Sequence, residues 1–178
     1  MHIKRSVLRI ITLYNEDMKR NQKTALIALG IALYTVLSAF VIIPIVNRIK
    51  LDLGYIVFGL YLNSFGLPAT LVGVIGCILG NLLKGGSIPF AWAIGQAFIG
   101  LTLGYLLPKT EKIYLKIIYC LLSAFIGIAV IKTIIEVAIY KFPIWLKFSS
   151  NFVAYIADVV PMIAGVLLNK KIRIFKNN

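Results

Sequence analysis

Long apolar blocks alternate with short polar junctions along almost the whole chain. The run from Gly66 to Gly80 contains no charged residue, and similar blocks precede and follow it. A helix that crosses a bilayer needs about 20 apolar residues, and somewhat fewer where the bilayer thins. The pattern predicts six spans, at residues 24–46, 51–66, 68–83, 89–107, 112–138 and 149–169. The second and third are short, so they are either two thin spans or a re-entrant hairpin.

Composition supports a membrane protein. Hydrophobic residues make up 60% of the 178 residues and charged residues only 14%, which is more apolar surface than a soluble domain of this length could hide from water. The predicted fold class is therefore all-α: an integral membrane bundle of six transmembrane helices, with residues 24–169 as the transmembrane domain. Cys77 and Cys120 lie inside apolar stretches, which favours small hydrophobic side chains over a disulfide or metal pair.

The basic residues predict the orientation of the bundle. With the N-terminus inside, thirteen Lys and Arg residues fall on the cytoplasmic side and five outside, while Lys132 falls within a span. Cytoplasmic loops carry an excess of Lys and Arg, so both termini are predicted to be cytoplasmic, in a multi-pass protein of the cell membrane. The net charge of +13 is thus sorted by loop, and it does not indicate a nucleic-acid-binding surface.

Both ends of the chain are basic. Residues 1–23 hold six basic residues, with apolar residues at helical spacing between them. This pattern predicts an amphipathic helix that lies on the anionic cytoplasmic leaflet. Residues 170–178 are predicted to form a basic cytoplasmic tail.

Polar and ionisable side chains inside the spans gather at one depth, the outer half of spans three to six. Such residues are costly within a bilayer and are functional-site candidates by default. They are Trp92, Gln96, Lys132, Glu136, Asn151, Tyr155 and Asp158, with Asn81 and Lys84 as lesser candidates. We expect them to line a cavity for a small polar aromatic ligand, with Trp92 as a stacking wall. Two simpler explanations stay open: Lys132 and Glu136 could neutralise each other as an i, i+4 pair, and Trp92 could be an interfacial anchor.

Small residues spaced by four mark faces where membrane helices approach closely. Ala28 and Ala32 form such a pair on the first span, and Gly73, Gly76 and Gly80 lie along the third. These faces could pack inside the bundle or dock another membrane subunit.

Together these features resemble the substrate-binding S component of energy-coupling factor (ECF) transporters, which take up vitamins and related micronutrients. The resemblance covers residues 24–169, where length and six-helix topology match. Ala28-x-x-x-Ala32 matches the AxxxA pattern of the first helix in that family. Leu51-Asp52-Leu53-Gly54 and Phe65-Gly66-Leu67-Pro68 look like the same region of riboflavin-type members, although those often read FGP where this chain has FGLP.

The resemblance implies a function and partners. The outer halves of the later spans would bind riboflavin or another heteroaromatic vitamin, and Ala28 and Ala32 would contact the transmembrane coupling (T) subunit. Two cytoplasmic ATPases would drive the import. The chain itself is expected to be no enzyme and to need no cofactor, because it has no G-x-x-x-x-G-K-[ST] phosphate loop and any ATP must be used by a partner.

Three other classes compete with this interpretation. Met1-His2-Ile3 resembles the start of cobalt and nickel S components, but the chain has no second histidine, so a metal site is not expected. Asp52 and Asp158 could form the dyad of an intramembrane aspartyl hydrolase, in which two carboxylates share a proton. A small structural scaffold would also explain the size and basic ends, but not the polar residues at one depth.

Overall fold

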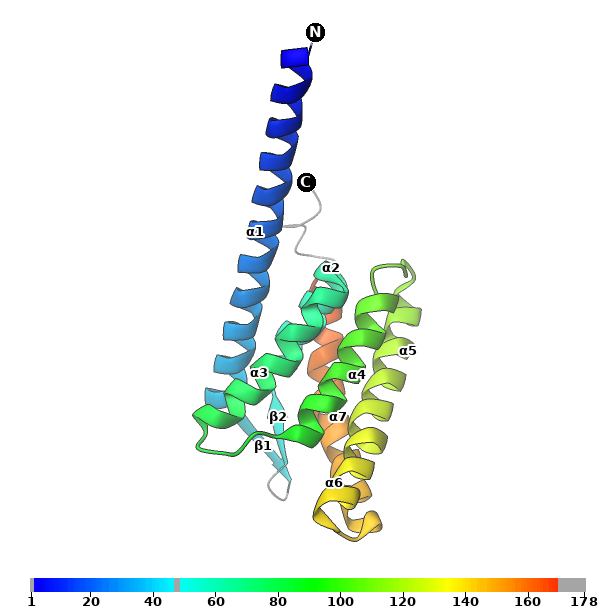
Figure 1. The fold of residues 1–178 in the computed structure, drawn as a ribbon. Coiled ribbons are helices and arrows are strands. Elements are labelled where there is room, and N and C mark those ends of the chain that lie inside the picture. Colours follow the sequence, from blue (N-terminus) through cyan, green and yellow to red (C-terminus); the bar gives the residue numbers. More distant parts are fainter. Residues whose placement is uncertain (1, 47–48, 170–178) are drawn as a thin grey trace.

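The computed structural model describes residues 2–46 and 49–169, with side chains described for residues 20–41, 43 and 51–169. Helical segments pack side by side and a short β-hairpin closes one end (Figure 1). The helices are α1 (His2–Phe40), α2 (Gly54–Phe65), α3 (Thr70–Leu83) after a 3₁₀ turn η1 (Leu67–Ala69), α4 (Phe90–Leu106), α5 (Ile113–Ala124), α6 (Lys132–Tyr140) and α7 (Ile144–Leu168). A π-helical stretch, η2 (Phe125–Ile131), joins α5 to α6 into one span. The prediction of an all-α bundle of six membrane helices is confirmed.

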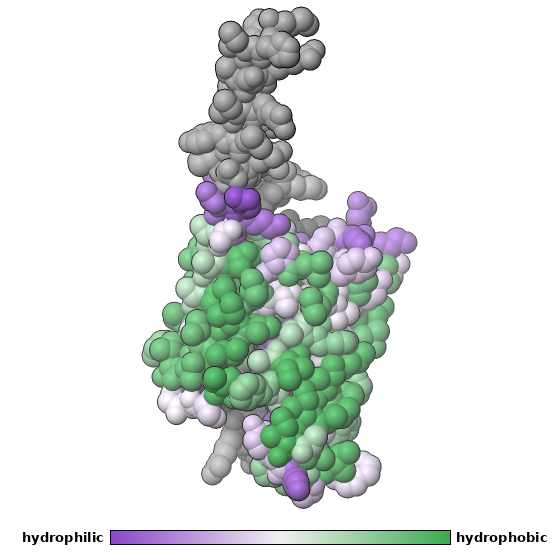
Figure 2. Space-filling view, viewed as in Figure 1, coloured by the Kyte–Doolittle hydropathy of each residue, from purple (hydrophilic) through white to green (hydrophobic). Residues whose placement is uncertain are grey.

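The outside of the bundle is apolar. Figure 2 shows hydrophobic residues over the side of the bundle and hydrophilic residues gathered at its two ends. Within the described residues, Arg20–Phe40, Ile113–Tyr140 and Ile144–Leu168 are long and apolar enough to cross a membrane. The helices at Leu67–Leu83 and Phe90–Leu106 are also apolar but shorter. This surface suits contact with lipid, because lipid tails are as apolar as the exposed side chains.

The two ends of the bundle differ. The N-terminal part of α1 and the end of α7 lie toward one end. The hairpin, the α3–α4 connection and the α6–α7 connection lie at the opposite end, which we call the hairpin end (Figure 1). Both of these helix connections were predicted to face outside, so the hairpin end corresponds to the predicted outer side.

The first predicted span is too long at its C-terminal end. Helix α1 stops at Phe40, and β1 (Ile42–Val46) then pairs antiparallel with β2 (Ile49–Asp52), with Ile43 opposite Leu51. The run before Pro44 is apolar and β-branched, and a short apolar run does not by itself distinguish strand from helix. The second span consequently begins at Gly54 rather than at residue 51.

Three further expectations concern the limits of helices. The last span begins at Ile144, directly after Pro143, rather than at residue 149. Helices α2 and α3 are separate, with 12 and 14 residues, so they are only about 18 and 21 Å long at 1.5 Å per residue. Helix α1 runs from His2 without a break, and the side chains before Arg20 and residues 170–178 lie outside the described part. The interfacial helix and the basic tail therefore stay predictions.

Helices α2 and α7 touch through their backbones. A Cβ atom added at Gly59 would overlap the carbonyl oxygen of Met162, and one added at Gly165 would overlap the carbonyl oxygen of Ile56. Small residues permit this approach, as is common between membrane helices. The contact fixes the position of α7 relative to α2, and both helices carry polar side chains that face the same cavity nearer the hairpin end.

Candidate functional site

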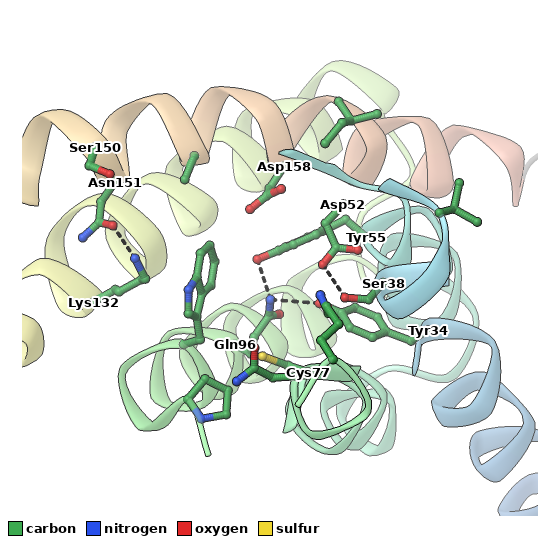
Figure 3. A pocket seen from close by; sticks show the side chains of 17 residues that line it. Tyr34, Ser38, Asp52, Tyr55, Cys77, Gln96, Lys132, Ser150, Asn151 and Asp158 are labelled. Carbon is green, nitrogen blue, oxygen red and sulfur yellow. Dashed lines mark hydrogen bonds between the residues drawn. The ribbon is translucent and has the colours of Figure 1, made fainter. Parts of the chain in front are cut away.

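A cavity of about 280 Å³ lies among the helices toward the hairpin end. Helices α1, α2, α3, α4, α6 and α7 and the hairpin all contribute to its wall, so it forms only when the bundle is assembled. Its polar and aromatic lining residues are Tyr34, Ser38, Asp52, Tyr55, Cys77, Asn81, Lys84, Trp92, Gln96, Lys132, Ser150, Asn151 and Asp158. In Figure 3, Lys132 and Asn151 stand on one side, Tyr34 and Ser38 on the other, and Gln96 and Asp158 between them.

Gln96 is held against two tyrosines from different helices. Its Nε2 donates to the Tyr55 hydroxyl oxygen at 2.5 Å and lies 3.4 Å from that of Tyr34 (Figure 3). Both rings pack with Phe58, the Tyr34 ring edge-on with centroids 6.3 Å apart, which fixes their orientation. Gln96 is only 1% exposed, and its Oε1 has no hydrogen-bond partner. A buried amide oxygen without a donor is costly, and it marks a place where a ligand group can bind.

Asp52 connects the hairpin to the helices on either side of it. Its Oδ2 accepts a hydrogen bond from Ser38 Oγ at the end of α1, and its Oδ1 accepts one from the Gly54 N–H at the start of α2, both at 2.8 Å. Asp52 lies in β2, outside the helices, and burial raises the pKa of its carboxyl group, while these two hydrogen bonds act in the opposite direction. The side chain thus anchors the hairpin over the cavity.

Lys132 belongs to a compact polar network between α6 and α7. Its Nζ donates to Asn151 Oδ1 and lies 3.2 Å from Glu136 Oε1. Asn151 Nδ2 in turn donates to Thr133 Oγ1 at 2.9 Å and to Glu136 Oε2 at 3.0 Å. The Lys132 ammonium also lies 4.3 Å from the centroid of the Trp92 ring, a cation–π distance. All the hydrogen-bonding directions of this buried ammonium are therefore directed at protein groups.

Asp158 differs from Lys132 in having no ion pair: it interacts with the Tyr55 hydroxyl group and the Asp52 backbone N–H, and the charge of Lys132 acts on it without an ion-pair contact. It is 3% exposed, lies on α7 and faces the cavity (Figure 3). Within the described residues, ion pairs join Glu136 to Lys132 and Lys147, and none involves Asp158. A carboxylate in this position is expensive for the protein unless something else compensates it.

The structure brings most of the sequence-predicted site residues to this cavity. Trp92, Gln96, Lys132, Asn151, Asp158, Asn81 and Lys84 line it. Glu136 is absent from the wall and instead holds Lys132 and Asn151, so the i, i+4 pair is present as well. Tyr155 also lies off the wall, where its ring packs on Phe125 at a centroid distance of 5.6 Å. Their roles in binding stay predictions.

Several lining residues were not predicted from the sequence. Tyr34 and Ser38 come from α1 and Tyr55 from α2, whereas the predicted site residues were taken from the later spans. Their hydroxyl groups within apolar spans were a weaker signal than the amide group that selected Gln96. Asp52 was considered as part of a family motif and of a hydrolase dyad, but not as a substrate contact. Although Asp52 and Asp158 line one cavity, no hydrogen bond joins their carboxyl groups among the described residues.

The donor set does not resemble a metal site. Within the described residues, no group of three or more His, Cys, Asp or Glu side chains is close enough to hold a metal ion. His2 lies outside the described side chains. What the cavity offers instead is two carboxylates, two tyrosine hydroxyl groups, amide groups and aromatic faces, a set suited to a small polar molecule.

Comparison with known proteins finds S components of ECF transporters. The family model for the ECF-type riboflavin transporter S component matches residues 19–173. A UPF0397 protein of Phytoplasma australiense is 26% identical over 90% of this chain and 89% of its own. One from Streptococcus thermophilus is 33% identical over 49% of this chain, which spans about half of that relative's length. The crystal structure of an S component for biotin, from an ECF-type ABC transporter, has the same fold: the TM-score is 0.65 at 19% identity, over 89% of this chain and 95% of that one.

Proposed function

The chain belongs to the family of ECF-type riboflavin transporter S components, and on this premise we propose that it captures a vitamin or related small micronutrient from outside the cell. It then delivers this substrate through a T subunit driven by two cytoplasmic ATPases. The single observation that carries the proposal is the cavity at the hairpin end, with its buried polar groups at the depth where the sequence places them. A scaffold protein has no need of such a cavity.

The position of the cavity suits capture from outside. It lies toward the hairpin end, opposite the end from which α1 projects. With both termini cytoplasmic, the hairpin end faces outward. The site then lies on the exterior side of the bundle, with the hairpin over it. Asn81, near the end of α3, and Lys84, in the exposed α3–α4 connection, line the site on this side. The substrate contacts are then the seven predicted residues on the wall, together with Tyr34, Ser38, Asp52 and Tyr55.

The face of α1 that bears Ala28 and Ala32 is the proposed contact with the T subunit. Both alanines are exposed, and so are Leu29 and Leu33 beside them. The small residues on α3 behave differently, because a Cβ added at Gly76 would meet the Tyr34 ring inside the bundle. The alanine face is therefore free for a partner helix, whereas the glycine face of α3 is used for packing within the chain.

The proposal is tested by identifying what the protein binds. The full chain is purified in mild detergent and denatured, and the released molecules are analysed by absorbance and mass spectrometry. We expect a stoichiometric vitamin-like compound. The variant Gln96→Leu removes the polar group at the centre of the cavity and should lose the compound. Thr102→Val is a matched control on the same helix, because its hydroxyl group bonds only to the Phe98 carbonyl oxygen of its own helix.

Uptake measurements complete the test. Cells that express the chain with a T subunit and both ATPases should accumulate the identified compound, and cells without the ATPases should not. A preparation that carries no compound and binds none of a vitamin panel would refute the proposal and favour the scaffold class. Chemical conversion of the bound compound by the purified chain would instead favour the aspartyl hydrolase.

A further inference from the structure

The charged groups around the cavity divide into those already satisfied by the protein and those left open. Lys132 is the one buried cation of the described wall, and it is satisfied. Its ammonium contacts Glu136, Asn151 and the face of Trp92. A ligand anion would have to displace Glu136 to gain this charge, so Lys132 is a poor anchor for a carboxylate or phosphate.

The open groups at the centre of the cavity are hydrogen-bond acceptors. Asp158 is 3% exposed and Gln96 is 1% exposed, and both line the cavity. Gln96 Oε1 has no donor, whereas the Asp158 carboxyl group interacts with the Tyr55 hydroxyl group and the Asp52 backbone N–H but has no ion-pair partner in the described part of the chain. The two groups come from different helices, α7 and α4, and face the same space (Figure 3).

The second cation of the wall does not alter this balance. Lys84 is exposed in the connection after α3, so its charge is hydrated and screened. Asp52, on the hairpin side, adds another carboxylate, which already accepts hydrogen bonds from Ser38 and Gly54 but keeps further lone pairs. The interior of the cavity is therefore rich in hydrogen-bond acceptors and holds two carboxyl groups, whereas the exposed lysine lies at its edge.

We propose that the ligand is a small nitrogen base, a protonated or amino-substituted heteroaromatic ring whose N–H groups bond Asp158 and Gln96 Oε1. This rests on the proposed function, since it names the substrate class of the same cavity. A ring of this kind suits the tyrosine and tryptophan walls, and a positive charge compensates the buried carboxylate. The volume of about 280 Å³ lies at the lower end of the usual range for ligand pockets, roughly 300–1,000 Å³, which favours a compact molecule.

The proposal separates this chain from its structural neighbour. That neighbour is an S component for biotin, and biotin carries a carboxylate at neutral pH. In this cavity a ligand carboxylate would face Asp158 and Asp52, and like charges in a buried site repel. The shared fold therefore does not carry a shared ligand charge.

Three probes of one shape test the charge preference: benzamidine (cationic), benzamide (neutral) and benzoate (anionic). Cys77 lines the cavity and is partly accessible, so a bound probe should protect it from N-ethylmaleimide. Cys120 is buried outside the cavity wall, and peptide mass spectrometry distinguishes the two thiols. We expect benzamidine to protect Cys77 at a concentration about tenfold lower than benzoate, a preference of ~1.4 kcal/mol. Benzamide should fall between them.

Variants show which carboxylate causes the preference. Asp158→Asn should abolish the advantage of benzamidine over benzoate. Glu111→Gln removes the same charge from an exposed position outside the cavity, and it should leave the advantage unchanged. Benzoate that protects as well as benzamidine, benzamidine that gives no protection, or an advantage that survives in Asp158→Asn would each overturn the proposal.

A second measurement on the unmodified chain avoids any loss of folding in the variant. The rates at which Cys77 reacts with cationic ethylammonium and anionic ethylsulfonate methanethiosulfonates report the local potential, and the cationic reagent should react faster relative to their rates with a free thiol. Equal relative rates would contradict the proposal. Failure of the transport function is distinguishable, because a chain without uptake can still show the charge preference. Vitamin uptake without any charge preference would refute only the ligand class.

Discussion

Glu136 compensates the charge of Lys132 within the bundle, so neutralising Glu136 should destabilise the protein. The two charged groups are 3.2 Å apart, and their side chains are 6% and 13% exposed. At an effective dielectric constant of ~20, a pair at that distance attracts by about 5 kcal/mol. Glu136→Gln keeps the shape and part of the hydrogen bonding, so we expect unfolding to become easier by about 3 kcal/mol, the lower limit measured for breaking buried pairs.

A double variant isolates the pairing from the loss of either side chain. In Lys132→Met with Glu136→Leu, neither charge is left alone in the bundle. We expect this variant to lose less stability than Glu136→Gln, because the destabilisation comes from the unpaired cation. Unfolding in mixed micelles by increasing fractions of SDS, followed by tryptophan fluorescence, measures the free energy of unfolding of the unmodified chain and of each variant. Lys147, at 3.8 Å from Glu136 and 26% exposed, can turn to water in both variants.

Whether the effects of changing Lys132 and Glu136 add up decides whether the two charges neutralise each other. If the double variant loses as much stability as the sum of the single variants Glu136→Leu and Lys132→Met, the two groups do not neutralise each other and the argument is refuted. Lys132 would then be free to bind an anionic ligand. A strongly non-additive result supports a structural pair that positions Asn151 and Trp92 at the cavity.

Three further outcomes are expected. Ala32→Trp should leave ligand binding intact and abolish uptake by the full complex, because the bulky ring lies on the exposed face of α1; normal uptake would refute the docking assignment. Gly165→Ala should lower the free energy of unfolding by about 1–3 kcal/mol, since the added methyl group meets the Ile56 carbonyl, whereas the methyl group of Gly80→Ala comes no closer than 3.3 Å to Ser38 and 3.5 Å to the Thr35 carbonyl oxygen and should cost much less. Asp52→Asn should weaken ligand binding several-fold in equilibrium dialysis, and we expect no hydrolase activity from the unmodified chain. A hydrolysis reaction that the unmodified chain performs and Asp52→Asn abolishes would support the dyad instead.

The apolar blocks of the sequence predicted the bundle because each membrane helix must present an unbroken apolar side to lipid. Each helix therefore appears in the sequence as one apolar block. The hairpin could not be predicted in the same way. Ile42–Val46 is as apolar as the helix before it, and only its pairing with Ile49–Asp52 shows that it is a strand. That pairing is a tertiary contact, which the local pattern does not contain.

The candidate site was predictable where polarity contrasts with an apolar span. Gln96 and Asp158 are conspicuous in this way, and both are buried on the cavity wall. Tyr34 and Tyr55 were missed because a tyrosine in a membrane helix is unremarkable until its hydroxyl group is seen to meet Gln96. The structure was also needed to identify the residue that neutralises Lys132, since the i, i+4 spacing of Glu136 allows a pair but does not establish it.

One helix carries both the proposed docking face and part of the cavity wall. On α1, Ala28 and Ala32 face outward, whereas Tyr34 and Ser38 face the cavity one to two turns further along. A partner that shifts or rotates α1 therefore changes the substrate's surroundings directly, with no relay through other helices. Thermodynamic linkage then fixes the reverse effect: any factor by which docking weakens substrate binding is the same factor by which bound substrate weakens docking. A loaded chain and an empty one would thus compete unequally for the same coupling subunit.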